Sequence, residues 1–78
     1  MKISVLGMGY VGLSNATMLS TKYEVICHDI DESKLESIEK RRSPIKDKLI
    51  SEFFKNKKLN LKTSIKINSE ISQSDFII

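Results

Sequence analysis

Three glycines that follow a short apolar run constrain the fold of this chain more than any other feature. Residues 2–6 read KISVL, and Gly7, Gly9 and Gly12 then give the pattern G-x-G-x-x-G. The run is typical of a short buried strand. From Tyr10 to about Ser20, apolar residues recur at helical spacing at Leu13, Ala16 and Leu19. The sequence therefore predicts a strand, a glycine turn and a helix.

The next segment repeats this alternation. Residues 24–28 contain the apolar run Val-Ile-Cys and predict a second buried strand, which stops at Asp29. Asp31 can cap a following helix that carries Leu35 and Ile38 on one face. The first forty residues thus predict the order strand, helix, strand, helix.

The remainder continues with a helix and two strands. Ser43 and Pro44 punctuate the chain, and Pro suits the start of a helix. A helix is predicted over Lys46–Asn56, a third strand within Leu59–Ile67, and a fourth from Asp75 to the last residue. We expect an α/β fold with a Rossmann-type parallel sheet and flanking helices, truncated after about four strands and forming one incomplete domain over residues 1–78. The apolar last residues, Phe76 to Ile78, would leave a sheet edge able to pair with a second copy as a homodimer.

The glycines can hold a phosphate or merely shape a turn. In a dinucleotide-binding loop, Gly7 permits the tight turn, Gly9 lets the backbone approach the pyrophosphate, and Gly12 allows close packing of helix on strand. The free N–H groups and the dipole at the helix start favour the phosphate charge. Because the pattern follows a strand, opens a helix and precedes a strand that ends in an acid, the phosphate interpretation is favoured.

Asp29 indicates which dinucleotide is bound. Its carboxylate can accept hydrogen bonds from the adenosine ribose, whereas it would repel a 2′-phosphate, so NAD is favoured over NADP. The alternative is an ordinary helix cap, a role for which Asp31 is better placed. Lys34, five residues further on, can reach the same ribose or a phosphate, or can simply face solvent, and its spacing does not decide.

Composition narrows the classes of partner. Residues 34–66 hold 11 of the 13 basic and 4 of the 10 acidic residues, so this stretch carries +7 and the rest −4. Its basic residues alternate with apolar ones at helical spacing and no aromatic platform is interleaved, which favours a solvated helical face over a nucleic-acid site. The sequence contains no membrane-length apolar run. One cysteine, Cys27, excludes an internal disulfide and fits a cytoplasmic protein.

Catalytic and metal-binding sets are missing from the sequence. Cys27 lies inside an apolar strand without an activating base, which predicts a structural thiol. His28, the single histidine, has no partners at metal-ligand spacing, and by default it faces solvent or an adjacent helix. We therefore expect neither a catalytic residue nor a metal site in this chain.

The strings KISVLGMGYVGLSNATMLS, EVICHDIDESKLESI, RRSPIKDKLISEFF and SDFII are more specific than a generic nucleotide fold. Together they resemble the N-terminus of the UDP-glucose/UDP-mannuronate dehydrogenase family, most closely its UDP-glucose-oxidising branch. The resemblance covers essentially all 78 residues. Its most specific parts are Gly7 to Leu13, Asp29 to Asp31 and Ser43 to Ile45.

The resemblance implies a cytoplasmic enzyme that oxidises C6 of a UDP-sugar to a carboxylate with two NAD in succession, for use in polysaccharide synthesis. It implies that the glycine loop holds the pyrophosphate and that the backbone at Tyr10 and Val11 lies near the cofactor. It also implies that Asp29 and Lys34 bind the adenosine ribose.

Members of this family are several hundred residues long and carry their catalytic cysteine far downstream. We therefore expect an N-terminal fragment that does not catalyse by itself.

Two other functions are compatible with the pattern. Ligand-sensing regulatory domains of the potassium-transport type also begin with this glycine motif and a strand-terminal acid, and they only bind. Hydroxyacid dehydrogenases of the 6-phosphogluconate type have an equally suitable fold.

Overall fold

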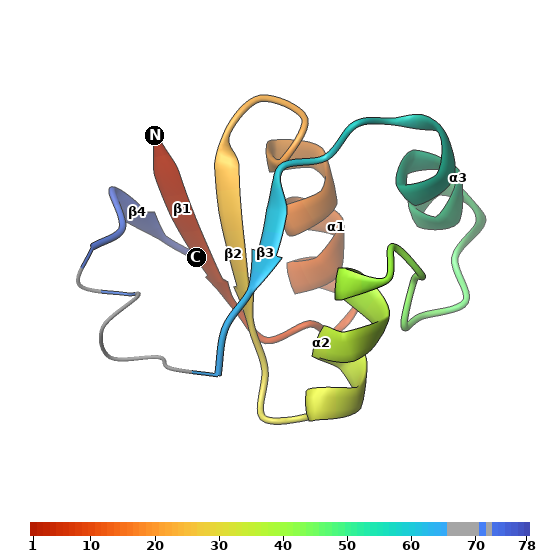
Figure 1. The fold of residues 1–78 in the computed structure, drawn as a ribbon, viewed down its shortest axis with the longest axis horizontal. Helices are drawn as coiled ribbons and strands as arrows, with labels where there is room; N and C mark the ends of the chain where they lie inside the picture. Colours follow the sequence, from red (N-terminus) through yellow and green to blue (C-terminus); the bar gives the residue numbers. More distant parts are fainter. Residues whose placement is uncertain (66–70, 72) are drawn as a thin grey trace.

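The computed structural model describes residues 1–65, 71 and 73–78. Strands and helices alternate in the first half of the chain (Figure 1). The elements are β1 (Lys2–Leu6), α1 (Tyr10–Leu19), β2 (Glu24–His28), α2 (Glu32–Glu39), α3 (Lys48–Asn56), β3 (Leu61–Thr63) and β4 (Phe76–Ile77). In this part of the chain, no helix has both the length and the apolar character needed to cross a bilayer.

The four strands form one parallel sheet in the order β3-β2-β1-β4. Leu6 lies opposite His28 at the end of the central pair. On either side of that pair, Val25 lies opposite Leu61, and Ile3 lies opposite Phe76. These are the first four positions of the doubly wound dinucleotide-binding sheet, in which the chain changes direction between β1 and β4. The predicted α/β fold with a Rossmann-type parallel sheet is confirmed.

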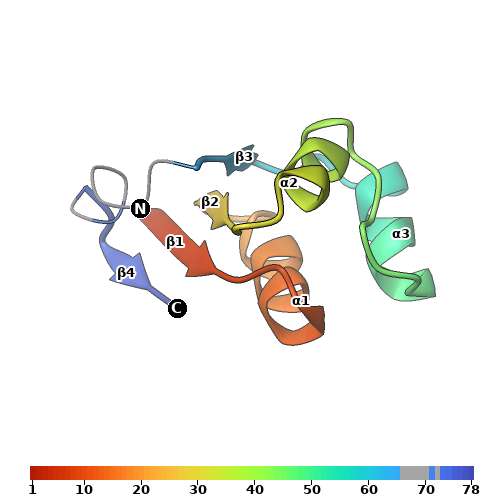
Figure 2. The same cartoon turned by 90° about the horizontal axis from the view of Figure 1, so that it is seen from below.

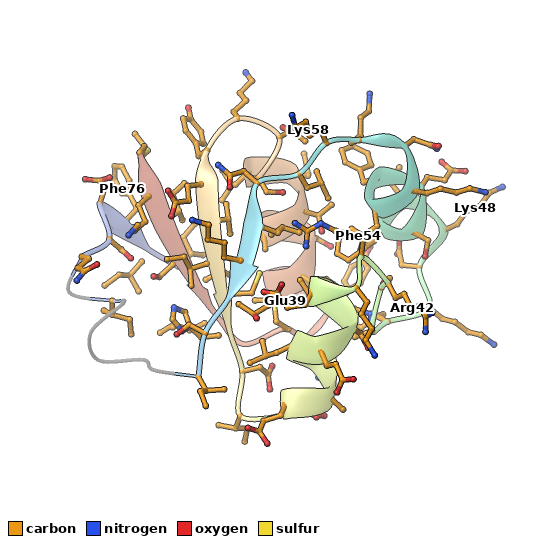
Figure 3. All side chains as sticks on the ribbon, viewed as in Figure 1. Glu39, Arg42, Lys48, Phe54, Lys58 and Phe76 are labelled. Carbon is orange, nitrogen blue, oxygen red and sulfur yellow. The ribbon has the colours of Figure 1, made fainter. Side chains whose placement is uncertain are left out.

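Helices α1, α2 and α3 lie on one side of the sheet (Figure 2). Alternate strand residues face them, because successive side chains of a strand point to opposite sides. Phe54 points from α3 toward the interior, whereas Lys48 on the same helix projects outward (Figure 3). The shared core consists chiefly of Ile3, Val5, Leu13, Ala16, Val25, Cys27, Leu35, Ile38, Ile50, Phe54, Leu59 and Leu61.

Helix α3 begins two residues later than the predicted Lys46. Asp47 is its N-cap, and its Oδ1 accepts a hydrogen bond from the Ile50 N–H at 2.9 Å. This side chain satisfies a donor of the first turn, so the helix starts after Asp47 rather than at Lys46. Leu49 is 63% exposed, because Ile50 and Phe54 occupy the buried face of this helix.

Strand β3 is shorter than the predicted segment, and residues 66 and 67 of that prediction lie outside the described residues. Its end is fixed from α2, since Glu39 Oε1 accepts hydrogen bonds from the Thr63 N–H at 3.1 Å and from its hydroxyl at 2.7 Å. Its start is held by Arg41, whose guanidinium donates to the carbonyls of Leu59 at 3.3 Å and Leu61 at 2.9 Å. Glu39, the last residue of α2, and Arg41, just after the helix, thus connect the end of α2 to the edge strand β3.

The prediction that His28 faces solvent is wrong. The ring is buried, and its Nε2 lies 3.3 Å from the hydroxyl of Ser4. It alternates with the core residue Cys27, so it points to the side of the sheet opposite α1, α2 and α3.

The prediction for Cys27 is confirmed. The thiol is free and fully buried, and this burial raises its pKa to about 12. A thiol so far from ionisation is not a nucleophile at neutral pH.

Strand β4 is the outermost strand of the described sheet, next to β1. The side chains of Phe76, Ile77 and Ile78 are exposed, and Phe76 lies at this edge of the molecule (Figure 3). Pairing of this edge with a second copy stays a prediction.

Candidate cofactor-binding site

Three backbone segments meet at the carboxyl ends of the parallel strands. The loop after β1 begins at Gly7, the turn after β2 begins at Asp29, and Ile78 follows β4. Backbone hydrogen bonds join them, from the Gly7 N–H to the His28 carbonyl and from the Leu6 N–H to the Ile78 carbonyl, both at 2.8 Å. In open sheets of this kind, the ligand crevice lies at this edge, where the strand order reverses.

Two of the three glycines are required by the fold itself. Gly7 has a φ of +88°, a backbone conformation that side chains disfavour. At Gly12, a Cβ atom would lie 1.9 Å from the Gly7 carbonyl oxygen, a distance that no real packing allows. These contacts let α1 start directly against the end of β1, as predicted for the first and third glycines.

Gly9 is different because nothing in the chain requires a glycine there. Its φ of −71° suits any residue, and a Cβ atom would meet nothing within 4 Å. Gly9 is the N-cap of α1, so the helix begins without a side-chain cap, and its first turn contains no acidic residue. The start of α1 therefore presents open space beside backbone N–H groups and the positive end of the helix dipole, which suits an anion.

The carboxylate of Asp29 lies directly beside this loop. Its Oδ2 accepts a hydrogen bond from the Met8 N–H at 2.7 Å, and its Oδ1 accepts one from the Asp31 N–H at 2.8 Å. The hydrogen bonds from Asp31 and Met8 lower the pKa of the Asp29 carboxyl, so the group is charged at neutral pH. Each oxygen keeps a further lone pair for a ligand hydroxyl.

Helix α2 is capped by Asp31 and not by Asp29. The Asp31 Oδ1 accepts from the Ser33 N–H at 3.0 Å, which satisfies a donor of the first turn. The helix-cap alternative for Asp29 is therefore wrong. Lys34 follows in the same turn, half-buried, and its positive charge helps to lower the pKa of both carboxyl groups.

Tyr10 and Val11 are the first two residues of α1, and they flank the loop. Their side chains are 60% and 70% exposed. This exposure leaves the two side chains accessible to a ligand bound at the start of α1.

Sequence reasoning gave no part to Met8, although it is central to the site. Its side chain is fully buried while its N–H is bound by Asp29. The one indication in the sequence was that position 8, between the first two glycines, carries an apolar residue that could be buried. The hydrogen bond itself could not be foreseen, because it depends on the register that places Leu6 opposite His28.

The described residues contain no group of three or more His, Cys, Asp or Glu side chains that could hold a metal ion. The Ser4–His28 contact brings a hydroxyl near an imidazole, but both side chains are buried, so a substrate has no access to them.

A parallel sheet in this order, a glycine loop opening α1 and a charged carboxylate at the end of β2 define a Rossmann-type dinucleotide-binding domain. Residues 1–78 match the family described as the UDP-glucose/GDP-mannose dehydrogenase family, NAD binding domain. The chain belongs to this family, and its cofactor is NAD.

Curated relatives agree with this assignment. The UDP-glucose 6-dehydrogenase of Campylobacter jejuni is 44% identical over 80 residues, which cover 100% of this chain and 20% of the relative. The UDP-glucose 6-dehydrogenase of Streptococcus pneumoniae is 48% identical over 65 residues, with 83% of this chain and 16% of the relative covered. The chain thus spans about a fifth of the length of such relatives.

Solved structures show the same fold. A GDP-mannose dehydrogenase from Pseudomonas aeruginosa superposes with a TM-score of 0.85 at 29% identity, covering 100% of this chain and 19% of that one. A UDP-glucose dehydrogenase from Pyrobaculum islandicum gives 0.82 at 22% identity, over 97% of this chain and 18% of that one. The resemblance to nucleotide-sugar dehydrogenases, rather than to regulatory domains or to the 6-phosphogluconate type, is confirmed.

Proposed function

We propose that this chain is the part that binds the adenosine side of NAD in a dehydrogenase that oxidises UDP-glucose to UDP-glucuronate with two NAD in succession. The UDP-glucose 6-dehydrogenases among its relatives support this substrate. NAD, when bound, supplies the hydride acceptor. The 78 residues position it and do not catalyse by themselves.

The observation that carries the proposal is the contrast among the glycines. Gly7 and Gly12 are explained by the fold, whereas Gly9 borders open space at an uncapped helix start. We infer that the cofactor pyrophosphate lies against Gly9 and the first turn of α1, with the backbone of Tyr10 and Val11 beside it. A side chain at position 9 would then occupy the space that the phosphate needs.

The ribose role falls to Asp29 and Lys34. The Asp29 carboxylate is charged, and its remaining lone pairs suit the two adenosine ribose hydroxyls. The same charge repels a 2′-phosphate, so NAD is preferred over NADP. Lys34, close enough to influence both neighbouring carboxyl groups, adds a cation at the ribose side.

The catalytic and sugar-recognising groups belong to the parent enzyme. The buried reduced thiol of Cys27 fits a cytoplasmic location for that enzyme. Its substrate partner is the UDP-sugar, and this chain contributes the cofactor side of the site.

Titration of the 78-residue chain with NAD by calorimetry tests the binding role. We expect weak binding, because only the adenosine side of the site is present. In Gly9→Ala the binding is lost while the chain stays folded, with only the small loss of stability of a changed helix cap, since nothing lies within 4 Å of the added Cβ. NAD binding by Gly9→Ala at wild-type strength would remove the pyrophosphate from this loop.

The activity is tested in the parent enzyme that carries this chain. NADH formation with UDP-glucose is expected, at two NADH for each UDP-glucuronate. The absence of turnover with any UDP-sugar would refute the proposed reaction, while the binding test above would still stand.

A further inference from the structure

We propose that Asp29 is also a positioning residue, which fixes the glycine loop before the cofactor arrives. Its carboxylate would thereby couple recognition of the ribose to the placement of the pyrophosphate-binding backbone. The first part depends only on the contacts within this chain, and the second rests on the function proposed above.

The geometry shows a side-chain carboxylate bonded to the loop just beyond the end of a strand ladder. The last backbone bond between the β1 and β2 segments runs from the Gly7 N–H to the His28 carbonyl at 2.8 Å. Gly7 then turns the chain away from the sheet, and the next donor, the Met8 N–H, points to the Asp29 Oδ2 at 2.7 Å. The carboxylate thus binds the first loop N–H that the strand pair leaves without a backbone acceptor.

The loop is held at its other points as well. The Met8 side chain is fully buried, and Gly12 lies so close to the Gly7 carbonyl that no Cβ fits between them. With both flanks of Gly9 fixed, the position of Gly9 is set by contacts that need no ligand. Of the three contacts named here, only the charge-assisted hydrogen bond to the Met8 N–H comes from a polar side chain, that of Asp29.

The second oxygen extends this control to the ribose side. The Asp29 Oδ1 accepts from the Asp31 N–H at 2.8 Å, so one carboxylate joins the loop after β1 to the turn that starts α2. The ribose hydroxyls would use the outward lone pairs of these same two oxygens. Any substitution at position 29 made to admit a 2′-phosphate would therefore also loosen the loop for the pyrophosphate.

Amide hydrogen exchange of the cofactor-free chain tests the positioning role. In Asp29→Ala we expect the Met8 amide to exchange about 10- to 100-fold faster, as for a lost hydrogen bond to a charged group. In Asp29→Asn the single amide oxygen can serve only one of the two N–H groups, so faster exchange is expected at Met8 or at Asp31. Amides in the middle of β2, such as Val25, keep their rates. Asp31→Asn is the matched control, because it removes the same charge two residues away while Asn can still cap α2.

Inorganic pyrophosphate, which has no ribose, provides a readout that ribose recognition cannot affect. Removal of a negative charge near an anion should by itself tighten binding, so Asp31→Asn should bind pyrophosphate as well as or better than wild type. A positioning role predicts the opposite for Asp29→Asn, a several-fold weaker affinity.

Each outcome decides a separate point. Unchanged Met8 exchange in both Asp29 variants, or tighter pyrophosphate binding by Asp29→Asn than by Asp31→Asn, would overturn the positioning role. Faster Met8 exchange in a chain that binds neither pyrophosphate nor NAD would keep the positioning role and refute the proposed function instead. If Asp29→Ala is unfolded by circular dichroism, Asp29→Asn decides through both amides, and unchanged exchange at Met8 and at Asp31 together would overturn the positioning role.

Discussion

The corner formed by β1, α1 and β2 differs from the half of the molecule that follows Arg42 in how its structure is specified. In the corner, each turn residue has one local task, such as the positive φ of Gly7 or the capping of α2 by Asp31. In the second half, α3 and β3 are placed mainly by tertiary contacts, such as the buried Phe54 and the hydrogen bonds of Glu39 and Arg41. Local chemistry is readable from sequence, whereas tertiary placement is not.

The largest loss of stability is expected for a substitution within the corner. Gly12→Ala should lower the free energy of unfolding by about 3 kcal/mol, because the new Cβ would overlap the Gly7 carbonyl and push α1 off β1. Gly9→Ala is the matched control and should cost less than about 1 kcal/mol, the usual range for a change of helix cap. Urea unfolding followed by circular dichroism measures both.

Equal losses for the two glycine variants would show that the contrast between them is wrong. The loop would then be strained or close-packed throughout, and the open space at Gly9 would no longer point to a ligand.

A smaller effect is expected in the second half. Asp47→Ala should cost about 1 kcal/mol, because the Ile50 N–H loses its cap at the start of α3. Glu52→Ala, an exposed change on the same helix, should alter stability by less than about 0.5 kcal/mol. Thermal unfolding midpoints compare the two, and a negligible effect of Asp47→Ala would mean that burial of Phe54 alone determines where α3 lies.

The smallest effect is the dependence of the corner on acid. Because the folded-state pKa of Asp29 is lowered, its contribution to stability is fully present above the unfolded value of about 3.9. That contribution is lost as the pH falls from this value through the folded-state pKa. The stability difference between wild type and Asp29→Asn should therefore be constant from pH 7 to about pH 5 and shrink below about pH 3.9. A difference that persists at pH 2 would assign it to shape rather than to charge.

Much of the fold follows from the sequence because its elements carry local markers. The β-branched run before Gly7, the acid that ends β2 and the N-cap Asp31 place three elements at the predicted residues. The roles of Gly7 and Gly12 in the turn follow in the same way, since no other residue type fits them. What the glycines and Asp29 bind remains a proposal.

The other features could not be predicted from the sequence, because they depend on contacts between distant segments. The sequence predicted a helix from Lys46, shortly after Pro44, whereas α3 begins after its N-cap Asp47. The burial of His28 depends on which side of β2 receives the helices, and the Asp29–Met8 bond depends on how β1 and β2 align. Such facts arise only when segments distant in the chain are brought together.

The burial of Cys27 allows opening of the sheet to be measured by thiol labelling. The thiol sits fully enclosed in the second strand, and a thiol-reactive dye cannot reach it while β2 keeps its neighbours on both sides. The rate at which a dye labels the untagged wild-type chain therefore reports how often the central strand is released. Slower labelling in the presence of NAD would show that the bound cofactor makes opening of the sheet less frequent. The native thiol serves as the probe, so no engineered label is needed.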